Sequence, residues 1–593
     1  MSLALATFLA YTGLLLAIGL WSYRLLEKVP IARYEEEFYT AGRGLGGIVV
    51  ALVIASGMAS AGTFIAGPGM CYAYGYSWVL INVMQTFLSL MLLGGVGIVV
   101  GLTARRVNLV SYLDLYKARY QDRTLVLIMG GLVTLLLIPY MATQFVGAAR
   151  VIVQMTGVSY PTALALGSAV VVLYCVLGGM RAASLATLLQ GAVITVGTVL
   201  LFAGTLRAAG GFTRSTQALA AIDTRLLSPT AHGAFPWPFV FSIACLSGYL
   251  AAGSPHGMLA ALTYKNTTAL KRGIWLGTIL VFLWTLLLCL AGVMGRGIVP
   301  DLGTPDEIAP WLAMNVLPGP LAGLVLAGVV AGIQTTVAAM AIVITSSVAR
   351  NVVQELGLEL TPQQMKTLSR VTMTSCLGAA IALALTQPPL VQWIILFALG
   401  GIGVSAFAPI VVGMYWRRGN RWGALAAVGC GMTLYVLAFT AAPQIGLLGM
   451  HPSVPCTAAA VALYVVVSLA TPPPPEDVAR TPLGKGESGG CGAYARRTQH
   501  DAAGLRLASE EAARDGQASN HRDRRVPSEH PTGRPLQDRP RSHQRGPVAV
   551  RPRRHRCGNL RMGRNVACLP DHRRDPGDER RGGGGPREAA AGK

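Results

Sequence analysis

Charged residues are scarce over most of this sequence. They make up 13% of its 593 residues, whereas hydrophobic residues make up 52% and the mean hydropathy is +0.50. This composition excludes an ordinary soluble domain and indicates a membrane protein. The scarcity ends near Ala470: residues 1–470 contain 24 Lys+Arg and 12 Asp+Glu, and residues 471–593 contain 25 and 15. The net charge of +22 thus divides between an apolar body and a charged tail, and it does not indicate nucleic-acid binding.

Several motifs that would indicate an enzyme or a metalloprotein are also missing. The ten cysteines form no CxxC pair and have no metal-like spacing with histidine. No carboxylate with a partner lies in the middle of an apolar segment, which argues against a proton relay, and no nucleophile–base constellation indicates a membrane enzyme. The segment "GRGLGG" at 42–47 fits the GxGxxG pattern, but no strand precedes it, so a glycine-rich elbow explains it better than dinucleotide binding.

Thirteen apolar stretches are long enough to cross a bilayer core, which takes about 20 residues each. The first is too long for a signal-peptide core and is expected to be retained. We predict an all-α polytopic membrane protein whose transmembrane domain covers residues 1–471, with spans near 3–22, 47–72, 76–101, 125–150, 160–178, 184–207, 236–254, 273–295, 319–349, 368–386, 389–415, 422–442 and 454–471.

The basic residues between these spans predict the orientation. With the N-terminus outside, 19 of the 24 Lys+Arg in the body fall in cytoplasmic loops, which favours an extracellular N-terminus and a cytoplasmic C-terminus in the plasma (inner) membrane. The tail, 472–593, has no apolar period and is predicted to be disordered. Its Arg-, Gly- and Pro-rich texture also resembles an out-of-frame reading of a GC-rich gene, and a basic arm on anionic lipid or RNA is the functional alternative.

The second span, "ALVIASGMASAGTFIAGPGM" at 51–70, is too rich in helix-weakening residues for a helix built only to cross lipid. Non-helical backbone survives at membrane depth only where it faces protein or a cavity, and transporters break helices there so that free carbonyls can face an ion. Close helix packing through small residues is the alternative explanation.

The ninth span places Thr335 and Thr336 in its middle, one turn beyond Gly332. Neutral oxygen ligands suit a weakly held monovalent ion, although a single Thr more often bonds a carbonyl of its own helix. The seventh span is the third weak helix, with Ser247-Gly248 and then Gly253-Ser254-Pro255. Its distance of five spans from the second suggests inverted five-helix repeats, about 47–207 and 236–415.

Two further polar residues in the spans leave alternatives open. Gln144, in the fourth span, is suited either to joining helices or to contacting a substrate. His256 follows Pro255 near the end of the seventh span, where a structural histidine is favoured over a gate or a proton relay.

The order and spacing of several segments resemble the sodium:solute symporter family over roughly residues 36–455. The most specific segments are "FYTAGRGLGG", "TFIAGPGMCYAYGYSWVL", "ARYQDRTLV", "TQFVGAARV", "VLGGMRAA" with "LQG", "GSPH" followed by "YKN", "KRGIWLGT", "LAGVMGRGIVPDL", "VLPG" and "LGMHPSVP". The resemblance implies a thirteen-span, inverted-repeat fold similar to that of amino-acid/sodium symporters, and sodium-coupled import of a small organic anion by alternating access.

The resemblance also implies the site residues. A sodium ion would bind between the second and ninth spans, held by carbonyl oxygens and two hydroxyls; the matching residues are Ser56, Ala59, Gly332, Thr335 and Thr336. The substrate would lie alongside, with Ser60, Thr63, Gln144 and Ser247 as candidate contacts.

Three departures from the family pattern bear on the substrate. Family members commonly carry "ND" where this chain has Ala186-Thr187, some place Arg at the position of Ala260, and some have an acidic residue at the position of Met58. They leave the solute and the number of coupled sodium ions open, as the sequence leaves the oligomeric state. A non-transporting membrane sensor is the alternative function, but the tail offers no folded output module.

Overall fold

The computed structural model describes residues 3–30, 34–41, 45–58, 60–106, 109–253, 255–358, 360–387, 391–442 and 445–475. Regular structure in this part of the chain is helical, apart from one isolated bridge between Leu45 and Tyr264. The helices, with η3, η7 and η8 π-helical and the other η elements 3-10, are α1 (Leu3–Glu27), α2 (Tyr34–Thr40), α3 (Gly47–Met58), η3 (Gly62–Ala66), α4 (Gly67–Tyr74), α5 (Tyr76–Arg106), α6 (Leu113–Tyr120), α7 (Arg123–Thr156), α8 (Tyr160–Ala208), α9 (Phe212–Ile222), η4 (Thr224–Leu227), η5 (Ala231–Gly233), α10 (Trp237–Gly253), α11 (Pro255–Thr263), α12 (Thr267–Ile298), η6 (Pro305–Glu307), α13 (Ile308–Val316), α14 (Gly319–Thr345), η7 (Ser346–Val352), α15 (Val353–Glu355), α16 (Pro362–Ala384), α17 (Gln392–Ala406), η8 (Phe407–Val412), α18 (Gly413–Tyr415), α19 (Arg421–Ala441), η9 (Leu447–Gly449) and α20 (Ser453–Ala470).

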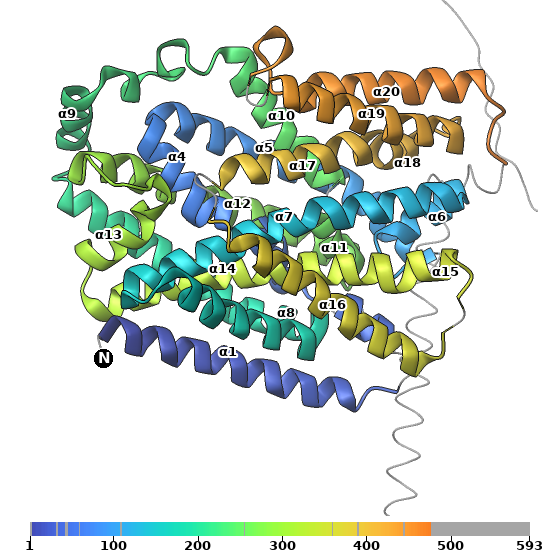
Figure 1. Ribbon diagram of the computed structural model, residues 1–593, viewed down its shortest axis with the longest axis horizontal. Coiled ribbons are helices and arrows are strands. Elements are labelled where there is room, and N and C mark those ends of the chain that lie inside the picture. The colour runs from blue at the N-terminus through green and yellow to red at the C-terminus, as the bar shows by residue number, and fades with distance from the viewer. Residues whose placement is uncertain are drawn as a thin grey trace, which may run out of the picture. The chain divides into compact units, whose positions relative to one another are not determined.

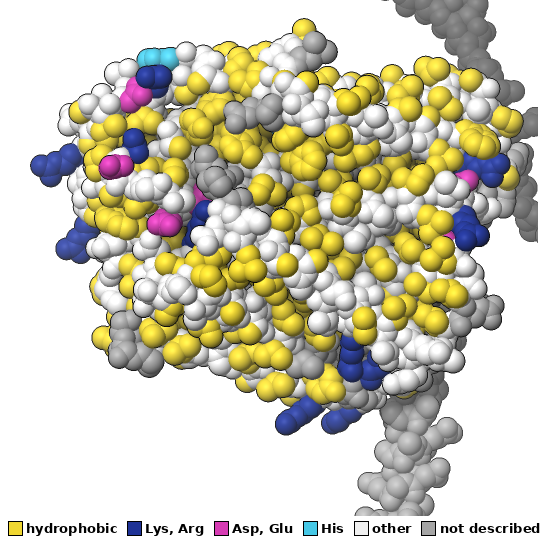
Figure 2. All heavy atoms as spheres, in the orientation of Figure 1, with side chains coloured by type: hydrophobic (Ala, Val, Ile, Leu, Met, Phe, Trp, Pro, Cys, Tyr) yellow, Lys and Arg dark blue, Asp and Glu magenta, His cyan; other side chains and the backbone are white. Residues whose placement is uncertain are grey.

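Nine helical stretches of the described chain are long and apolar enough to cross a membrane. Hydrophobic side chains cover much of the surface in Figure 2, and the charged side chains lie mainly near helix ends. Such a surface would be unstable in water and suits a lipid environment, so the chain is a multi-pass membrane protein. The predicted tail from residue 476 onward lies outside the described residues, and its disorder stays a prediction.

The described helices overlap the predicted spans, although their number does not confirm thirteen separate spans, and several helices extend beyond the apolar run. Asp122 caps α7 by accepting from the Leu125 N–H at 2.8 Å, and Asn266 caps α12 by accepting from the Ala269 N–H, also at 2.8 Å. A capping side chain satisfies an exposed N–H group, so a helix can begin in polar sequence before the apolar segment starts. Hydropathy alone therefore places these helix starts too late.

The 49-residue helix α8 contains two predicted spans. A straight helix of that length would measure about 73 Å, far more than a bilayer core. Its early part packs Gly167 on Ile152, near the end of α7, and its late part places Gly204 beside Leu317, just before α14. The end of α7 contacts η6 and α13, which lead into α14. The early part of α8 therefore packs on the end of α7, and its late part packs beside the end of α13.

The helices α7 and α14 run through the centre of the bundle (Figure 1). Of the nine apolar stretches, the one that contains α14 is the most deeply buried. It packs against α1, α3, α7, α8 and α16, whereas α19 and α20 pack mainly on each other and on α17. Polar residues in α14 are thus shielded from lipid and can form an internal site.

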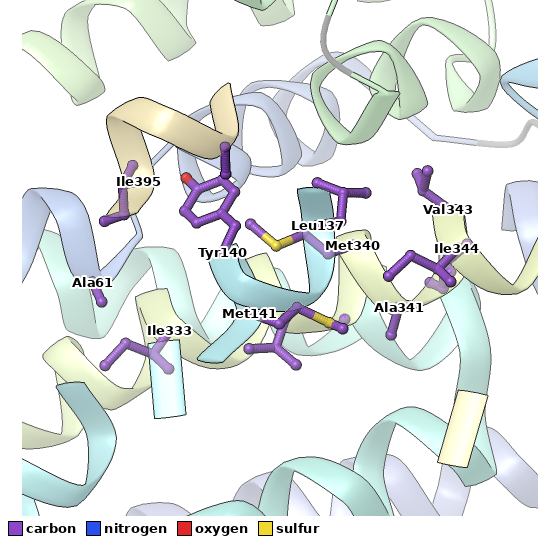
Figure 3. Packing of buried hydrophobic residues seen from close by; sticks show 14 of the residues in the cluster. Ala61, Leu137, Tyr140, Met141, Ile333, Met340, Ala341, Val343, Ile344 and Ile395 are labelled. Atoms are coloured by element: carbon purple, nitrogen blue, oxygen red, sulfur yellow. The ribbon is translucent and has the colours of Figure 1, made fainter. Parts of the chain in front are cut away.

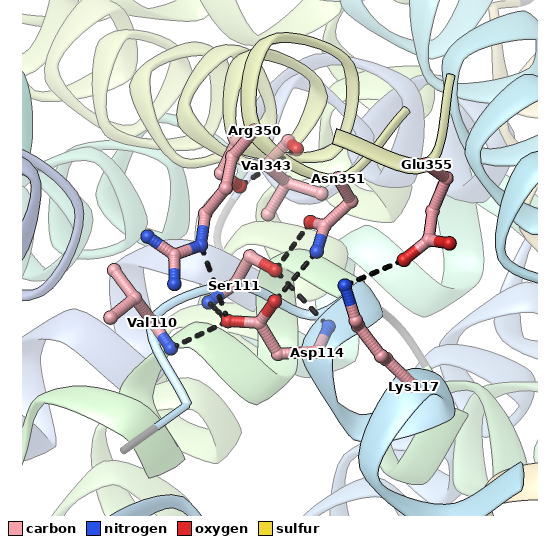
Figure 4. Close-up of polar contacts among 9 residues, drawn as sticks. Val110, Ser111, Asp114, Lys117, Val343, Arg350, Asn351 and Glu355 are labelled. Atoms are coloured by element: carbon pink, nitrogen blue, oxygen red, sulfur yellow. Dashed lines mark hydrogen bonds and ion pairs between the residues drawn. The ribbon is translucent and has the colours of Figure 1, made fainter. Parts of the chain in front are cut away.

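The short helices α9 and α13 lie at one end of the bundle and α6 and α15 at the other (Figure 1), and we call these the α9 end and the α6 end. At the α6 end a buried carboxylate fixes α6 to η7, which follows α14 (Figure 4). Asp114 Oδ2 accepts from the N–H groups of Val110 and Ser111 at 2.9 and 3.0 Å, and its Oδ1 accepts from Asn351 Nδ2 at 2.6 Å. The sequence analysis did not find these loop helices, because they lie outside the apolar runs.

Candidate functional site

The second predicted span is interrupted where its helix-weakening residues lie. Helix α3 ends at Met58, and the π-helical turn η3 begins at Gly62. Ser60 starts the second half: its carbonyl accepts from the N–H groups of Thr63 and Phe64 at 2.8 and 3.1 Å, and its Oγ accepts from the Gly62 N–H at 3.1 Å. The helix is therefore interrupted at Ser60, whereas Ser56 to Met58 still belong to α3. Ala59 lies outside the described residues, and so does the side chain of Ser56.

Gln144, on α7, forms a hydrogen bond with the backbone at the break. Its Oε1 accepts from the Ala61 N–H at 2.7 Å, and its Nε2 donates to Thr143 Oγ1 at 3.2 Å. The side chain is fully buried. An N–H group released by a broken helix would be costly to bury without a partner, and Gln144 supplies one. Of the two roles open from the sequence, the described contacts support joining helices, and contact with a substrate stays a prediction.

Helices α10 and α11 lie close to this break; residue 254, between them, lies outside the described residues. Tyr140, on α7, connects the break to α11: its hydroxyl donates to Ser60 Oγ at 3.4 Å, and its ring meets the ring of buried His256 edge-on, with centroids 5.7 Å apart. Tyr140 was not predicted as a site residue, although it follows a helix-interior proline and precedes Gln144 by one turn. The side chain of Ser247 lies outside the described residues.

The hydroxyl pair of α14 is buried and directed at one carbonyl. Thr335 Oγ1 and Thr336 Oγ1 donate to the Gly332 carbonyl at 2.9 and 3.1 Å. This is the bonding to their own helix that single threonines favour. A hydroxyl that donates its hydrogen in this way keeps oxygen lone pairs that can face a cation. Because α14 packs against α3 and η3, both predicted halves of the sodium site lie on neighbouring elements.

The donors of this region are neutral. Among the described residues, no group of three or more His, Cys, Asp or Glu side chains is placed to hold a metal ion. Hydroxyl and carbonyl oxygens bind alkali cations weakly enough for release, whereas clustered carboxylates suit divalent ions. Thr63 is half-buried and Ser60 buried, beside the break. The arrangement is suited to reversible binding of a monovalent cation.

A buried ion pair covers the break at the α9 end. Asp306, in η6, is fully buried and binds Arg150 of α7 at 2.6 Å between Oδ2 and Nη1; the same oxygen accepts from the Val391 N–H at 3.2 Å. Gly69 of α4 packs so closely that a Cβ there would lie 2.5 Å from Asp306 Oδ1. One carboxylate thus joins η6, α7 and the start of α17, and it packs on α4, in the second half of the broken helix. The sequence analysis did not connect these residues.

A buried, interrupted helix in a polytopic helical bundle is typical of secondary transporters. The family model described as "SSF: Sodium:solute symporter family" matches residues 38–431, two-thirds of the chain. The chain therefore belongs to the sodium:solute symporter family, and it couples solute import to sodium.

The curated relatives include two named transporters. The chain is 34% identical to the sodium/pantothenate symporter of Escherichia coli over 464 residues, which cover 77% of this chain and 94% of the relative. It is also 34% identical to the sodium/pantothenate symporter of Haemophilus influenzae over 408 residues, covering 68% and 84%. These comparisons give no support to the sensor alternative.

Among solved structures, the fold is similar to that of a Na+-coupled sialic acid symporter in its substrate-bound outward-open state. The TM-score is 0.67 and the identity 17%, over 80% of this chain and 99% of the other. The similarity shows the shared fold, and the helix bundle described above is accordingly that of a sodium-coupled symporter.

Proposed function

We propose that this protein imports a small organic anion, such as pantothenate, together with sodium by alternating access. The substrate class follows from the two relatives that are 34% identical and are named for pantothenate. The observation that carries the mechanism is the interruption of the second predicted span at Ser60, between α3 and η3, which both pack against α14, the helix of the hydroxyl pair. Inward movement of sodium would be driven by its gradient and by the membrane potential, about 2.3 kcal/mol per charge per 100 mV.

Sodium binds, in this proposal, between α3 and α14. The ligands are the carbonyl oxygens of Ser56, Ala59 and Gly332 and the hydroxyls of Thr335 and Thr336. The packing of α14 against α3, and the shared direction of both hydroxyls toward Gly332, support this set. Sodium would favour one arrangement of the helices, and so raise the affinity for the solute, only if it binds that arrangement more tightly.

The solute lies next to the break, with Ser60, Thr63, Gln144 and Ser247 as contacts. Ser60, Gln144, Thr335 and Thr336 are buried in the structure, so a solute from water reaches them only after helices move. Helix α12 packs on both halves of the broken helix; a Cβ at Gly277 would lie 3.2 Å from the Ala51 carbonyl oxygen. We expect α3, α4 and α12 to move together against α7 and α14.

The proposed topology has thirteen spans in inverted repeats, about 47–207 and 236–415, within a transmembrane domain of residues 1–471. The helix-weakening residues of the second and seventh predicted spans, one in each predicted repeat, support the inversion. The α6 end would face the cytoplasm and the α9 end the outside, with the N-terminus outside and the C-terminus inside. Lys117, Arg119 and Arg350 at the α6 end support this orientation.

Uptake of labelled pantothenate by membrane vesicles tests the proposal. We expect uptake driven by an inward sodium gradient and its loss when choline replaces sodium. Equal uptake in choline would refute the coupling, and sodium-stimulated uptake of other solutes without pantothenate would refute the substrate. A chain ending at residue 475 should transport as well as the full chain, because the proposed site lies within residues 1–471.

A further inference from the structure

Gln392, the first residue of α17, carries a buried polar group with no partner. The residue is 6% exposed, and its amide oxygen Oε1 is buried without a hydrogen-bond partner in the described structure. Buried amide oxygens are nearly always paired, and an unpaired one is destabilising. Gln392 lies at the start of an apolar segment, where a residue of similar size without polar atoms would avoid this cost. A polar ligand explains the presence of an amide here.

The position of this amide is next to the helix break. A Cβ placed on Gly62 would lie 3.7 Å from Gln392 Oε1 and 3.0 Å from Ser60 Oγ. Oε1 and Ser60 Oγ therefore lie near the same turn, where Gly62 has no side chain. The Cδ1 atom of Ile395, one turn further along α17, would lie 3.2 Å from the same added Cβ, and Figure 3 shows Ile395 on the Ala61 side of the cluster that includes Tyr140.

We propose that Gln392 determines substrate specificity by accepting a hydrogen bond from a hydroxyl or amide N–H group of the transported anion. This inference rests on the proposed function and narrows its substrate class to hydroxyl- or amide-bearing carboxylates. An ionised carboxylate has no hydrogen to donate, so it cannot satisfy Oε1. A solute with only a carboxylate would leave this oxygen unpaired, and the site would select against it.

Sodium is the other group that an amide oxygen can bind. The proposed sodium ligands lie at the end of α3 and on α14, whereas Gln392 reaches η3, on the opposite side of the break, from α17. The location therefore favours the solute.

Gln392 is also next to the buried ion pair at the α9 end. The N–H of Val391 donates to Asp306 Oδ2, so the residue that contacts the solute is joined through one peptide unit to the group that links η6 and α7. A solute held by Gln392 would thus contact the first turn of α17, next to the ion pair of Arg150 and Asp306.

The test compares wild-type protein with Gln392→Met, which keeps a similar volume and removes no hydrogen bond of the described structure. In vesicles, the KM for labelled pantothenate should rise about 10- to 100-fold, as for the loss of one buried hydrogen bond, with a smaller change in maximal rate. The sodium concentration for half-maximal uptake should not change. The inhibition constant of unlabelled valerate, which has no hydroxyl or amide group, should be lower for Gln392→Met than for the wild type, because the substitution removes the oxygen that valerate would leave unpaired.

Gln363→Met is the matched control, because Gln363 is exposed at the start of α16. It should leave KM unchanged, and melting temperatures of both variants in detergent at or above that of the wild type would exclude misfolding. An unchanged KM in Gln392→Met overturns the inference, and a rise in the half-maximal sodium concentration by the same factor would assign Gln392 to the ion instead. Absence of sodium-dependent uptake in the wild type overturns the proposed function, and this inference with it.

Discussion

The buried pair of Arg150 and Asp306 allows a quantitative prediction. Asp306 is fully buried, and the side chain of Arg150 is 9% exposed, so solvent screens their interaction little. Asp306→Asn keeps the shape of the side chain but leaves the guanidinium buried without this counter-ion. Removing one partner of a buried pair costs about 3–5 kcal/mol. We expect the free energy of unfolding to fall by that amount.

The assay is unfolding of the detergent-solubilised protein by SDS titration, with Asp306→Asn, Arg150→Gln and the double variant compared in a double-mutant cycle. The double variant should lose less than the sum of the two single variants, because it leaves no lone buried charge. Asp223→Asn is the control: this carboxylate pairs with Arg225 on the surface, and its replacement should not change stability measurably. If Asp306→Asn is as stable as Asp223→Asn, the junction of η6, α7 and the start of α17 does not depend on the ion pair.

Two further substitutions test the close packing of Gly69 on Asp306 and the burial of His451. Gly69→Ala should destabilise the protein by about 1–3 kcal/mol, since its Cβ would lie 2.5 Å from Asp306 Oδ1 and 2.9 Å from Asp306 Cα, whereas Gly303→Ala, with nothing within 4 Å, should be neutral in the same SDS titration. Burial lowers the pKa of His451, in the loop before α20, from 6.5 to about 4. Between these values the unfolded chain binds a proton that the folded chain does not, so stability falls as pH falls; at pH 5 this amounts to about 2 kcal/mol relative to neutral pH. In His451→Gln the loss of stability between pH 7 and pH 5 should be smaller by this amount, and an unchanged loss would contradict the burial of a neutral imidazole.

The helix positions and the break in the second span could be predicted from the sequence, because both depend on local composition. Apolar length determines which segments can cross a bilayer, and Ser, Gly and Thr in mid-span mark backbone that needs partners other than its own helix. The helix starts were predicted less well where Asp122 and Asn266 extend a helix into polar sequence. The short helices α6 and α9 have no apolar signal that separates them from loops.

Contacts between distant segments could not be predicted in this way. Asp306 and Arg150 are 156 residues apart, and each alone is an ordinary charge near a helix end. Gln144 was noticed as a polar residue in a span, but its partner, the Ala61 N–H, depends on how α7 packs on the break. Gln392 had the same signal as Gln144, a polar residue in an apolar segment, and its unpaired amide becomes evident only once α17 is packed against η3.

The central claim, sodium binding between the broken helix and α14, is tested most directly by the sodium dependence of uptake in Thr335→Ala/Thr336→Ala. We predict that the sodium concentration for half-maximal uptake of labelled pantothenate rises about tenfold or more, because two oxygen ligands are removed. The Thr335→Ser/Thr336→Ser variant, which retains both hydroxyls, should stay close to wild type. Thr433→Ala controls for the loss of a hydroxyl that bonds its own helix, since Thr433 is exposed on α19 and donates to the Gly429 carbonyl at 2.9 Å. An unchanged sodium dependence in the double alanine variant would contradict the site.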